Sequence, residues 1–186
     1  DSVKVRDVYR HGEKVVDHGV VRPFERPFIR ADIWKAVRNS FYLDPVSEKD
    51  FHIVPEGEKC RVIKLVPCQV ITEEWIAGID FSKGNGVDLG RDILKLAVIE
   101  RHMNSGHIGC GFISGLGLKR GAIASSVSHD SHNLIVAGTN DTDMAYAANR
   151  IRELGGGLVV VDGGSVLAEM ALPIAGLMGK RSAREM

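Results

Sequence analysis

"AIASSVSHDSHNLIVAG", residues 122–138, places a strongly polar loop between two short apolar runs. The runs at 122–127 and 134–138 have the length and composition of buried β-strands. The stretch that joins them, residues 125–133, overlaps the end of the first run and holds four serines, two histidines, one aspartate and one asparagine. Because α/β folds place their sites on loops at strand ends, this stretch predicts a sheet with a polar, functional loop at a strand end.

Further strands flank this centre. "ILKLAVIER" at 93–101 is almost continuously apolar, which predicts a central strand. "CRVIKLVPCQVITEEWI" at 60–76 is rich in β-branched residues and predicts either a long strand pair or one strand bent at Pro67. The segment 106–121, which lies between the predicted strands at 93–101 and 122–127, is glycine-rich and is expected to contribute tight turns.

A helix and a hairpin complete the predicted domain. Asn140 or Asp141 can cap a helix whose apolar stripe is Met144, Ala147, Ala148, Ile151 and Leu154, and Gly155–Gly157 ends it. Residues 158–172 read as two strands around the turn "DGGS". The order of elements predicts an α/β fold, with α+β possible, in which a mixed β-sheet sandwich carries flanking helices.

The N-terminal region is predicted to be separate. Residues 1–22 form a short β-ribbon, and "RPFERP" at 22–27 reads as a linker because its two prolines restrict the backbone and remove donors. Residues 31–43 are predicted to form an amphipathic helix. We therefore place one segment at 1–27 and the main domain at 28–186.

Composition narrows the classes of function. The 186 residues contain 24 basic and 24 acidic side chains, which argues against a nucleic-acid partner. No apolar run approaches the roughly 18 residues that span a bilayer, so we expect no membrane partner and a cytoplasmic location. Three cysteines do not make a disulfide framework.

The candidate site centres on the polar loop. His129, Asp130 and His132 are candidate acid, base or hydrogen-bonding groups, and Ser125 and Ser126 are candidate substrate contacts. The alternative is that the serines and Asp130 only make local turns. A metal on this loop is disfavoured because the sequence has neither H-E-x-x-H nor H-x-H.

A second polar segment follows the predicted central strand. Glu100, His102 and His107 are candidate substrate contacts on another wall of the same pocket. The alternative is an ion pair between Glu100 and Arg101 beside surface histidines. The glycines at 109–121 have neither the G-x-G-x-x-G spacing nor the G-K-[ST] motif of a phosphate loop. The "PCQV" at 67–70 lacks the second cysteine of the zinc nucleobase deaminases.

The stretch "ERHMNSGHIGCGFISGLGLKRGAIASSVSHDSHNLIVAGTNDTDMAYAANRIRELGGGLVVV", followed by "LPIAGLM", resembles the C-terminal domain of bacterial adenine deaminases, amidohydrolase-superfamily enzymes. The resemblance is close over residues 90–179. The N-terminal ribbon resembles the last strands of the β-sandwich that accompanies amidohydrolase barrels.

The resemblance implies a metal-dependent hydrolase that converts adenine to hypoxanthine and ammonia. In that family a divalent metal (manganese, iron or zinc) is held by a (β/α)₈ barrel, which 186 residues cannot contain beside the other parts. We therefore expect no metal on this chain, no activity of the chain alone, and two partners, the missing barrel and adenine.

The residues leave two other functions open. The first is a non-catalytic purine-binding or oligomerisation module. The second is a stand-alone metallohydrolase that uses His129, Asp130 and His132. We also expect a homo-oligomer, because a severed contact with the barrel would leave apolar surface uncovered.

Overall fold

The computed structural model describes residues 3–25, 28–38, 40–82, 84–182 and 185. The chain divides into two compact units, Asp1–Ile33 and Trp34–Met186. This division falls six residues beyond the end of the predicted linker at residue 27.

The first unit contains the expected β-ribbon. Its three strands pair in the order β1-β2-β3, and both pairs are antiparallel. His11 and Gly12 take positive φ angles of 50° and 86° in the turn between the first two strands. The strands are β1 (Val8–Arg10), β2 (Glu13–Asp17) and β3 (Val20–Val21).

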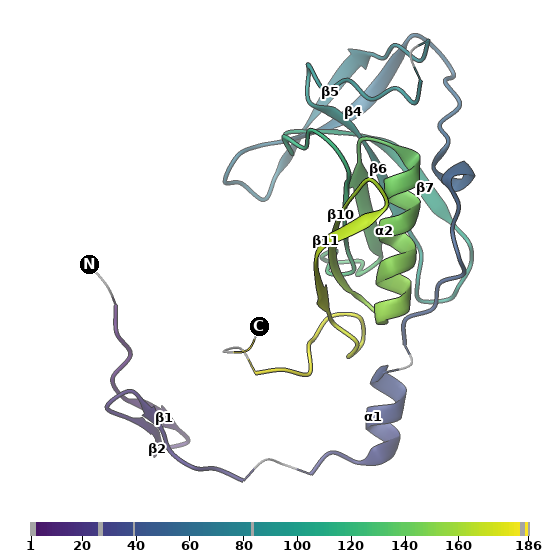
Figure 1. The fold of residues 1–186 in the computed structure, drawn as a ribbon. Coiled ribbons are helices and arrows are strands. Elements are labelled where there is room, and N and C mark those ends of the chain that lie inside the picture. The colour runs from purple at the N-terminus through teal and green to yellow at the C-terminus, as the bar shows by residue number, and fades with distance from the viewer. Residues whose placement is uncertain (1–2, 26–27, 39, 83, 183–184, 186) are drawn as a thin grey trace. The chain divides into compact units, whose positions relative to one another are not determined.

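The second unit is built on an eight-stranded sheet in the order β11-β10-β8-β9-β6-β7-β4-β5 (Figure 1). All neighbours are antiparallel except β4 and β7, which run parallel. The predicted α/β class with a mixed sheet is therefore confirmed. The strands are β4 (Lys59–Leu65), β5 (Thr72–Gly78), β6 (Ile93–Ile99), β7 (Ile108–Ser114), β8 (Ala122–Ser125), β9 (Leu134–Gly138), β10 (Gly157–Asp162) and β11 (Ser165–Ala171).

The alternatives that the sequence left open at 60–76 are resolved as a strand pair. β4 and β5 form an antiparallel hairpin, and Cys68 takes a φ of 58° in the turn between them. β6 lies in the interior of the sheet between β7 and β9, as its apolar run predicts. All three cysteines are free thiols.

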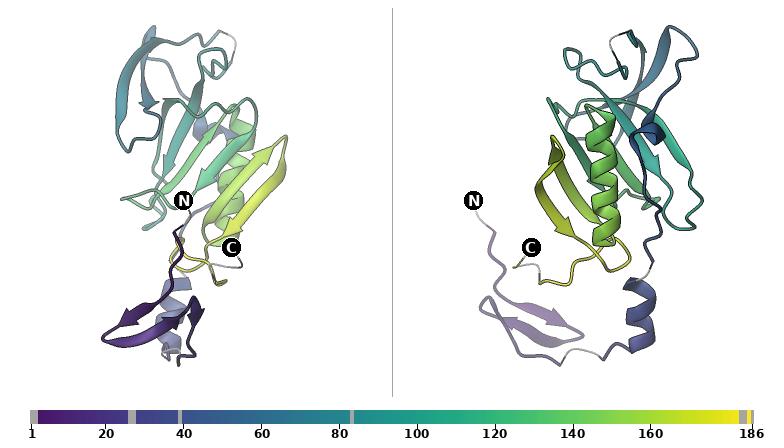
Figure 2. Two further views of the ribbon diagram at one scale, coloured as in Figure 1. Left: turned by 90° about the vertical axis from the view of Figure 1, so that its left-hand side faces the viewer. Right: turned by 45° about the vertical axis from the view of Figure 1, so that its right-hand side comes forward.

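Helix α2 (Asp141–Leu154) begins and ends where the sequence predicts. The side chain of Asn140 accepts a hydrogen bond from the backbone N–H of Asp143 at 2.7 Å. Gly155 ends the helix with a φ of 71°, and its N–H donates to the carbonyl of Arg152. The stripe side chains Met144 and Ile151 are fully buried. The helix lies against one face of the sheet (Figure 2).

Apolar side chains lie on both faces of the sheet. On the α2 face, Ala97, Val136 and Val159 pack with the helix. On the opposite face, Leu94, Leu96, Ile113 and Ala137 form a smaller cluster, against which Leu116 and Leu118 of the loop after β7 pack. The central strand β6 is therefore buried on both faces along most of its length.

Helix α1 (Ala31–Arg38) is shorter than the predicted helix at 31–43, so that prediction is wrong in length. Tertiary contacts hold the next residues in an extended path: the carbonyl of Ser40 accepts from Arg101, and the N–H of Tyr42 donates to the carbonyl of Arg101. A short 3-10 helix, η1 (Glu48–Phe51), follows. No helix among the described residues is long and apolar enough to cross a membrane.

Candidate functional site

The two polar segments meet at one end of the sheet. β6 and β8 end there, and their antiparallel neighbours β7, β9 and β10 begin there. Ile99 at the end of β6 lies opposite both Leu134 and Ile108. The loop after β6 therefore lies beside the loop between β8 and β9.

A direct contact joins these loops. The Nε2 atom of His102 lies 2.8 Å from the carbonyl oxygen of Ser131. Within the second loop the rings of His129 and His132 meet edge to face, 5.9 Å between centroids. His129 pairs with the carboxylate of Asp130. The side chains of His129 and Asp130 are 83% and 85% exposed, so they project from the end of the sheet.

Through its carboxylate, Glu100 holds together the first of these loops, the one that follows β6. Its carboxylate accepts hydrogen bonds from the backbone N–H groups of His102, Met103 and Ser105, and from the Ser105 hydroxyl at 2.8 Å. The N–H of Ser105, and then the other donors, lower the pKa of Glu100 to about 2. Both carboxylate oxygens of Glu100 therefore accept hydrogen bonds from within this turn. His107 lies at its far end, where its carbonyl accepts from the Glu100 N–H at 3.0 Å and its side chain is exposed.

Arg101 holds the second loop in place, and sequence reasoning missed it. Its side chain is almost fully buried and donates to the carbonyls of His132 (2.7 Å), Ser40 (3.1 Å) and Ala175 (3.1 Å). The guanidinium also lies over the ring of Phe41, 5.0 Å from its centroid. Burial lowers the pKa of Arg101. Only its place at the end of a buried strand could have signalled this role.

The first two serines of the second loop make internal hydrogen bonds of different range. Ser126 is fully buried; its hydroxyl donates to the Gly176 carbonyl at 2.5 Å and accepts from the Gly157 N–H at 2.7 Å, and so binds the backbone of two distant segments. The Ser125 hydroxyl accepts from the N–H of Val127 at 3.1 Å, which is a local turn. The alternative of local turns that the sequence left open therefore holds for Ser125. These contacts leave the outward side chains of His129 and Asp130 unassigned.

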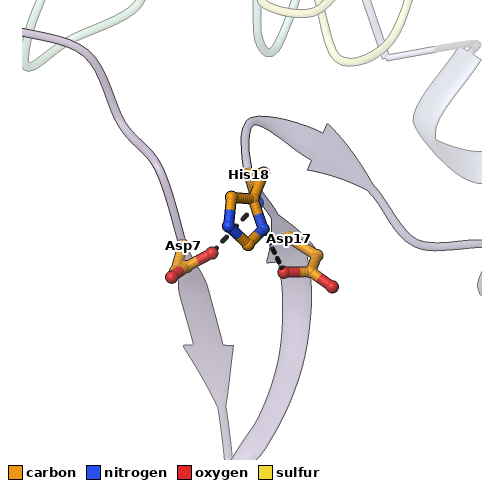
Figure 3. Close-up of side chains that lie close together, drawn as sticks. All are labelled: Asp7, Asp17 and His18. Carbon is orange, nitrogen blue, oxygen red and sulfur yellow. Dashed lines mark hydrogen bonds and ion pairs between the residues drawn. The ribbon is translucent and has the colours of Figure 1, made fainter.

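One group of three possible metal ligands occurs among the described residues, and it lies in the β-ribbon. Asp7, Asp17 and His18 lie together beside the turn between β2 and β3 (Figure 3). His18 Nδ1 is 2.9 Å from Asp17 Oδ1, and the N–H of His18 donates to Asp7 at 3.0 Å.

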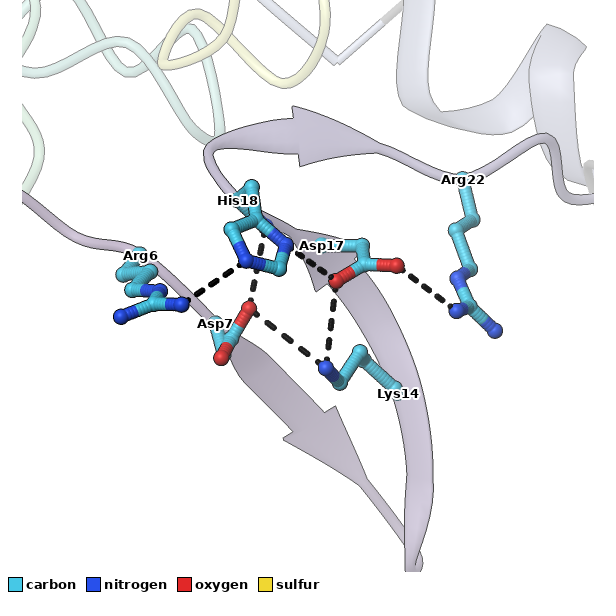
Figure 4. A network of polar contacts seen from close by, with 6 residues as sticks. All are labelled: Arg6, Asp7, Lys14, Asp17, His18 and Arg22. Atoms are coloured by element: carbon cyan, nitrogen blue, oxygen red, sulfur yellow. Dashed lines mark hydrogen bonds and ion pairs between the residues drawn. The ribbon is translucent and has the colours of Figure 1, made fainter.

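The surroundings of that group do not fit a metal ion (Figure 4). Arg22 contacts Asp17 at 2.9 Å, Lys14 contacts it at 3.1 Å, and Arg6 contacts the Nε2 of His18 at 2.8 Å. The hydrogen bond from Arg22, followed by that from Lys14, lowers the pKa of Asp17 to about 2. Two cationic side chains already pair with the carboxylates and a third lies against the imidazole, so a further cation would be repelled.

The second unit is thus an α/β domain whose polar loops meet at one sheet end. Hydrogen bonds from the buried side chains of Arg101 and Ser126 hold these loops. The adenine deaminase C-terminal domain model matches residues 69–186, and the chain belongs to this family. It is 44% identical to an adenine deaminase of Desulfatibacillum aliphaticivorans over 94% of the chain, and 47% identical to that of Brucella anthropi over 90%. It is 41% identical to adenine deaminase 2 of Carboxydothermus hydrogenoformans over 98% of the chain.

The chain spans about 30% of the length of these curated relatives. More than two thirds of such a protein therefore lies outside the structure described here.

Proposed function

We propose that this chain is the C-terminal domain of a metal-dependent adenine deaminase, which converts adenine and water to hypoxanthine and ammonia. The family match and the names of the relatives support this function. The ligand group in the ribbon does not fit a metal, so we assign the divalent ion (manganese, iron or zinc) to the remainder of the longer polypeptide. The chain alone is then inactive.

Within that enzyme we propose that two loops face the substrate: the loop after β6 (residues 100–107) and the loop between β8 and β9 (residues 126–133), called the joined loops below. The observation that carries this proposal is the contact between His102 and Ser131, which gathers His102, His129 and His132 at one sheet end. Imidazole nitrogens can donate to or accept from the ring nitrogens of a purine. Asp130 can accept from its exocyclic amine. The roles of these groups are to bind and orient adenine and to exclude water.

The test is a paired replacement in the longer enzyme. His129→Asn with Asp130→Ala removes both outward groups, and we expect turnover to fall at least tenfold. Because both side chains are largely exposed, the unfolding temperature should stay unchanged. His52→Asn is the matched control, since His52 is exposed and lies next to η1. Unchanged turnover in the double variant would refute the role of the loop.

Metal analysis and adenine deamination of the 186-residue chain separate the alternatives. We expect neither stoichiometric metal nor ammonia release. Metal with turnover would instead make His129, Asp130 and His132 a complete site in a stand-alone metallohydrolase. Adenine binding without turnover, lost on replacing His129 and Asp130, would indicate a purine-binding module.

A further inference from the structure

The sheet face opposite α2 is covered only in part. Near the far strand ends, Val87, Leu116 and Leu118 pack over Leu94 and Ile113. The part beside the joined loops has exposed apolar side chains: Leu158 and Val160 of β10 are 40% and 37% exposed. The left panel of Figure 2 views the sheet from this side.

We define the open face by its strand positions, which the pairing register places on one side of the sheet. All are apolar or small and none carries a charge. They are Val98, Gly109, Gly111, Ile123, Ser125, Ile135, Leu158, Val160, Ala168 and Met170. An uncharged, partly exposed sheet face is typical of a surface that another protein segment covers.

Two glycines in β7 support this interpretation. A Cβ atom built on Gly109 or on Gly111 would meet nothing within 4 Å, and neither residue needs a positive φ. Glycine inside a strand lowers stability, by about 0.5–1 kcal/mol relative to alanine. Nothing within the described chain requires glycine at these positions. Glycine there is explained if a segment from outside the chain approaches the backbone closely.

We propose that the open face is the docking surface for the remainder of the same longer polypeptide, the part that precedes this domain in the adenine deaminase relatives. The length outside the chain argues for this occupant, because the chain spans only about 30% of those relatives. A covalently linked partner also has a high effective concentration, which favours it over a second copy.

Continuity with the joined loops argues in the same direction. Ser125 belongs both to the open face and to the start of the loop that carries His129 and Asp130. A segment that packs on Leu158 and Val160 would therefore lie beside the start of that loop, because Leu158 pairs with Ser125. This step rests on the proposed function, in which those tips face a site formed by the rest of the enzyme.

The test is the alkylation rate of single introduced cysteines, followed by fragment-ion mass spectrometry of the peptides, which separates each introduced thiol from the native ones, including position 109 from the neighbouring Cys110. Gly109→Cys and Val160→Cys probe the open face, and both are small changes. Gly57→Cys and Val54→Cys are matched controls, because Gly57 also has an open Cβ position and Val54 is 72% exposed. Each variant is labelled with a maleimide in the 186-residue chain and in the longer enzyme.

We expect the two open-face cysteines to react at least tenfold more slowly in the longer enzyme than in the 186-residue chain, with equal rates for the controls. Equal rates at all four positions would overturn the proposal. Protection in the 186-residue chain that disappears on dilution would also overturn it, because a second copy would then cover the face. The labelling needs no turnover, so its failure is distinct from failure of the loop replacements that test the proposed function.

Discussion

Arg101→Met should destabilise the domain strongly, because one buried side chain holds three separate segments. The guanidinium donates to carbonyls of Ser40, His132 and Ala175, which are far apart in the sequence. At a net value of about 1 kcal/mol for each hydrogen bond, their loss lowers the free energy of unfolding by about 3 kcal/mol. Loss of the contact with the Phe41 ring adds about 0.5–1 kcal/mol.

The unfolding temperature of the 186-residue chain provides the assay. For a domain of this size the combined loss of about 3.5–4 kcal/mol corresponds to a fall of about 7–16 °C. Arg101→Lys keeps the charge but loses the planar fork, so its fall should be intermediate. Arg61→Met is the matched control; the Arg61 side chain is 85% exposed and pairs with Glu74, so its removal should cost less than about 0.5 kcal/mol. A fall of less than 2 °C for Arg101→Met would refute the conclusion that Arg101 holds the three segments together.

Three further predictions concern the supports of the loops. Ser126→Ala leaves the Gly157 N–H without its side-chain acceptor, so the free energy of unfolding in urea should fall by about 1–3 kcal/mol. Gly156→Ala places a Cβ 2.3 Å from the Cα of Gly176 at a φ of 113°, and should destabilise by about 2–4 kcal/mol, whereas Gly57→Ala should not. Glu100→Gln should lower the urea midpoint at pH 7. Because the folded pKa of Glu100 is about 2, below its ordinary value of 4.5, this difference should be complete above pH 4.5 and shrink as the pH falls towards 2; a pH-independent difference would contradict it.

Local patterns predicted the parts of the fold that depend on neighbours in the sequence. The stripe through Met144 and Ile151 gave α2, and Gly155 ends it with the left-handed conformation that glycine adopts easily. The polar run 125–133 was likewise predicted as a strand-end loop. These features need no knowledge of distant contacts.

Features that depend on distant contacts could not be predicted. Helix α1 ends at Arg38 because Ser40 and Tyr42 bond to a residue about 60 positions away. The order of strands, with β8 between β9 and β10, is set by long-range pairing. Arg101 looked like one half of a surface ion pair with Glu100, yet its hydrogen bonds reach three carbonyls in the interior.

The polar residues near the joined loops divide into two groups with different consequences for mutation. Glu100, Arg101 and Ser126 make hydrogen bonds with backbone groups, and so fix the loop paths. His129 and Asp130 point outward and pair with each other, and the His129 ring also meets the ring of His132. Replacing a member of the first group should therefore change stability and turnover together. Replacing the outward pair should change turnover alone, so measuring both quantities on each variant distinguishes a support from a substrate contact.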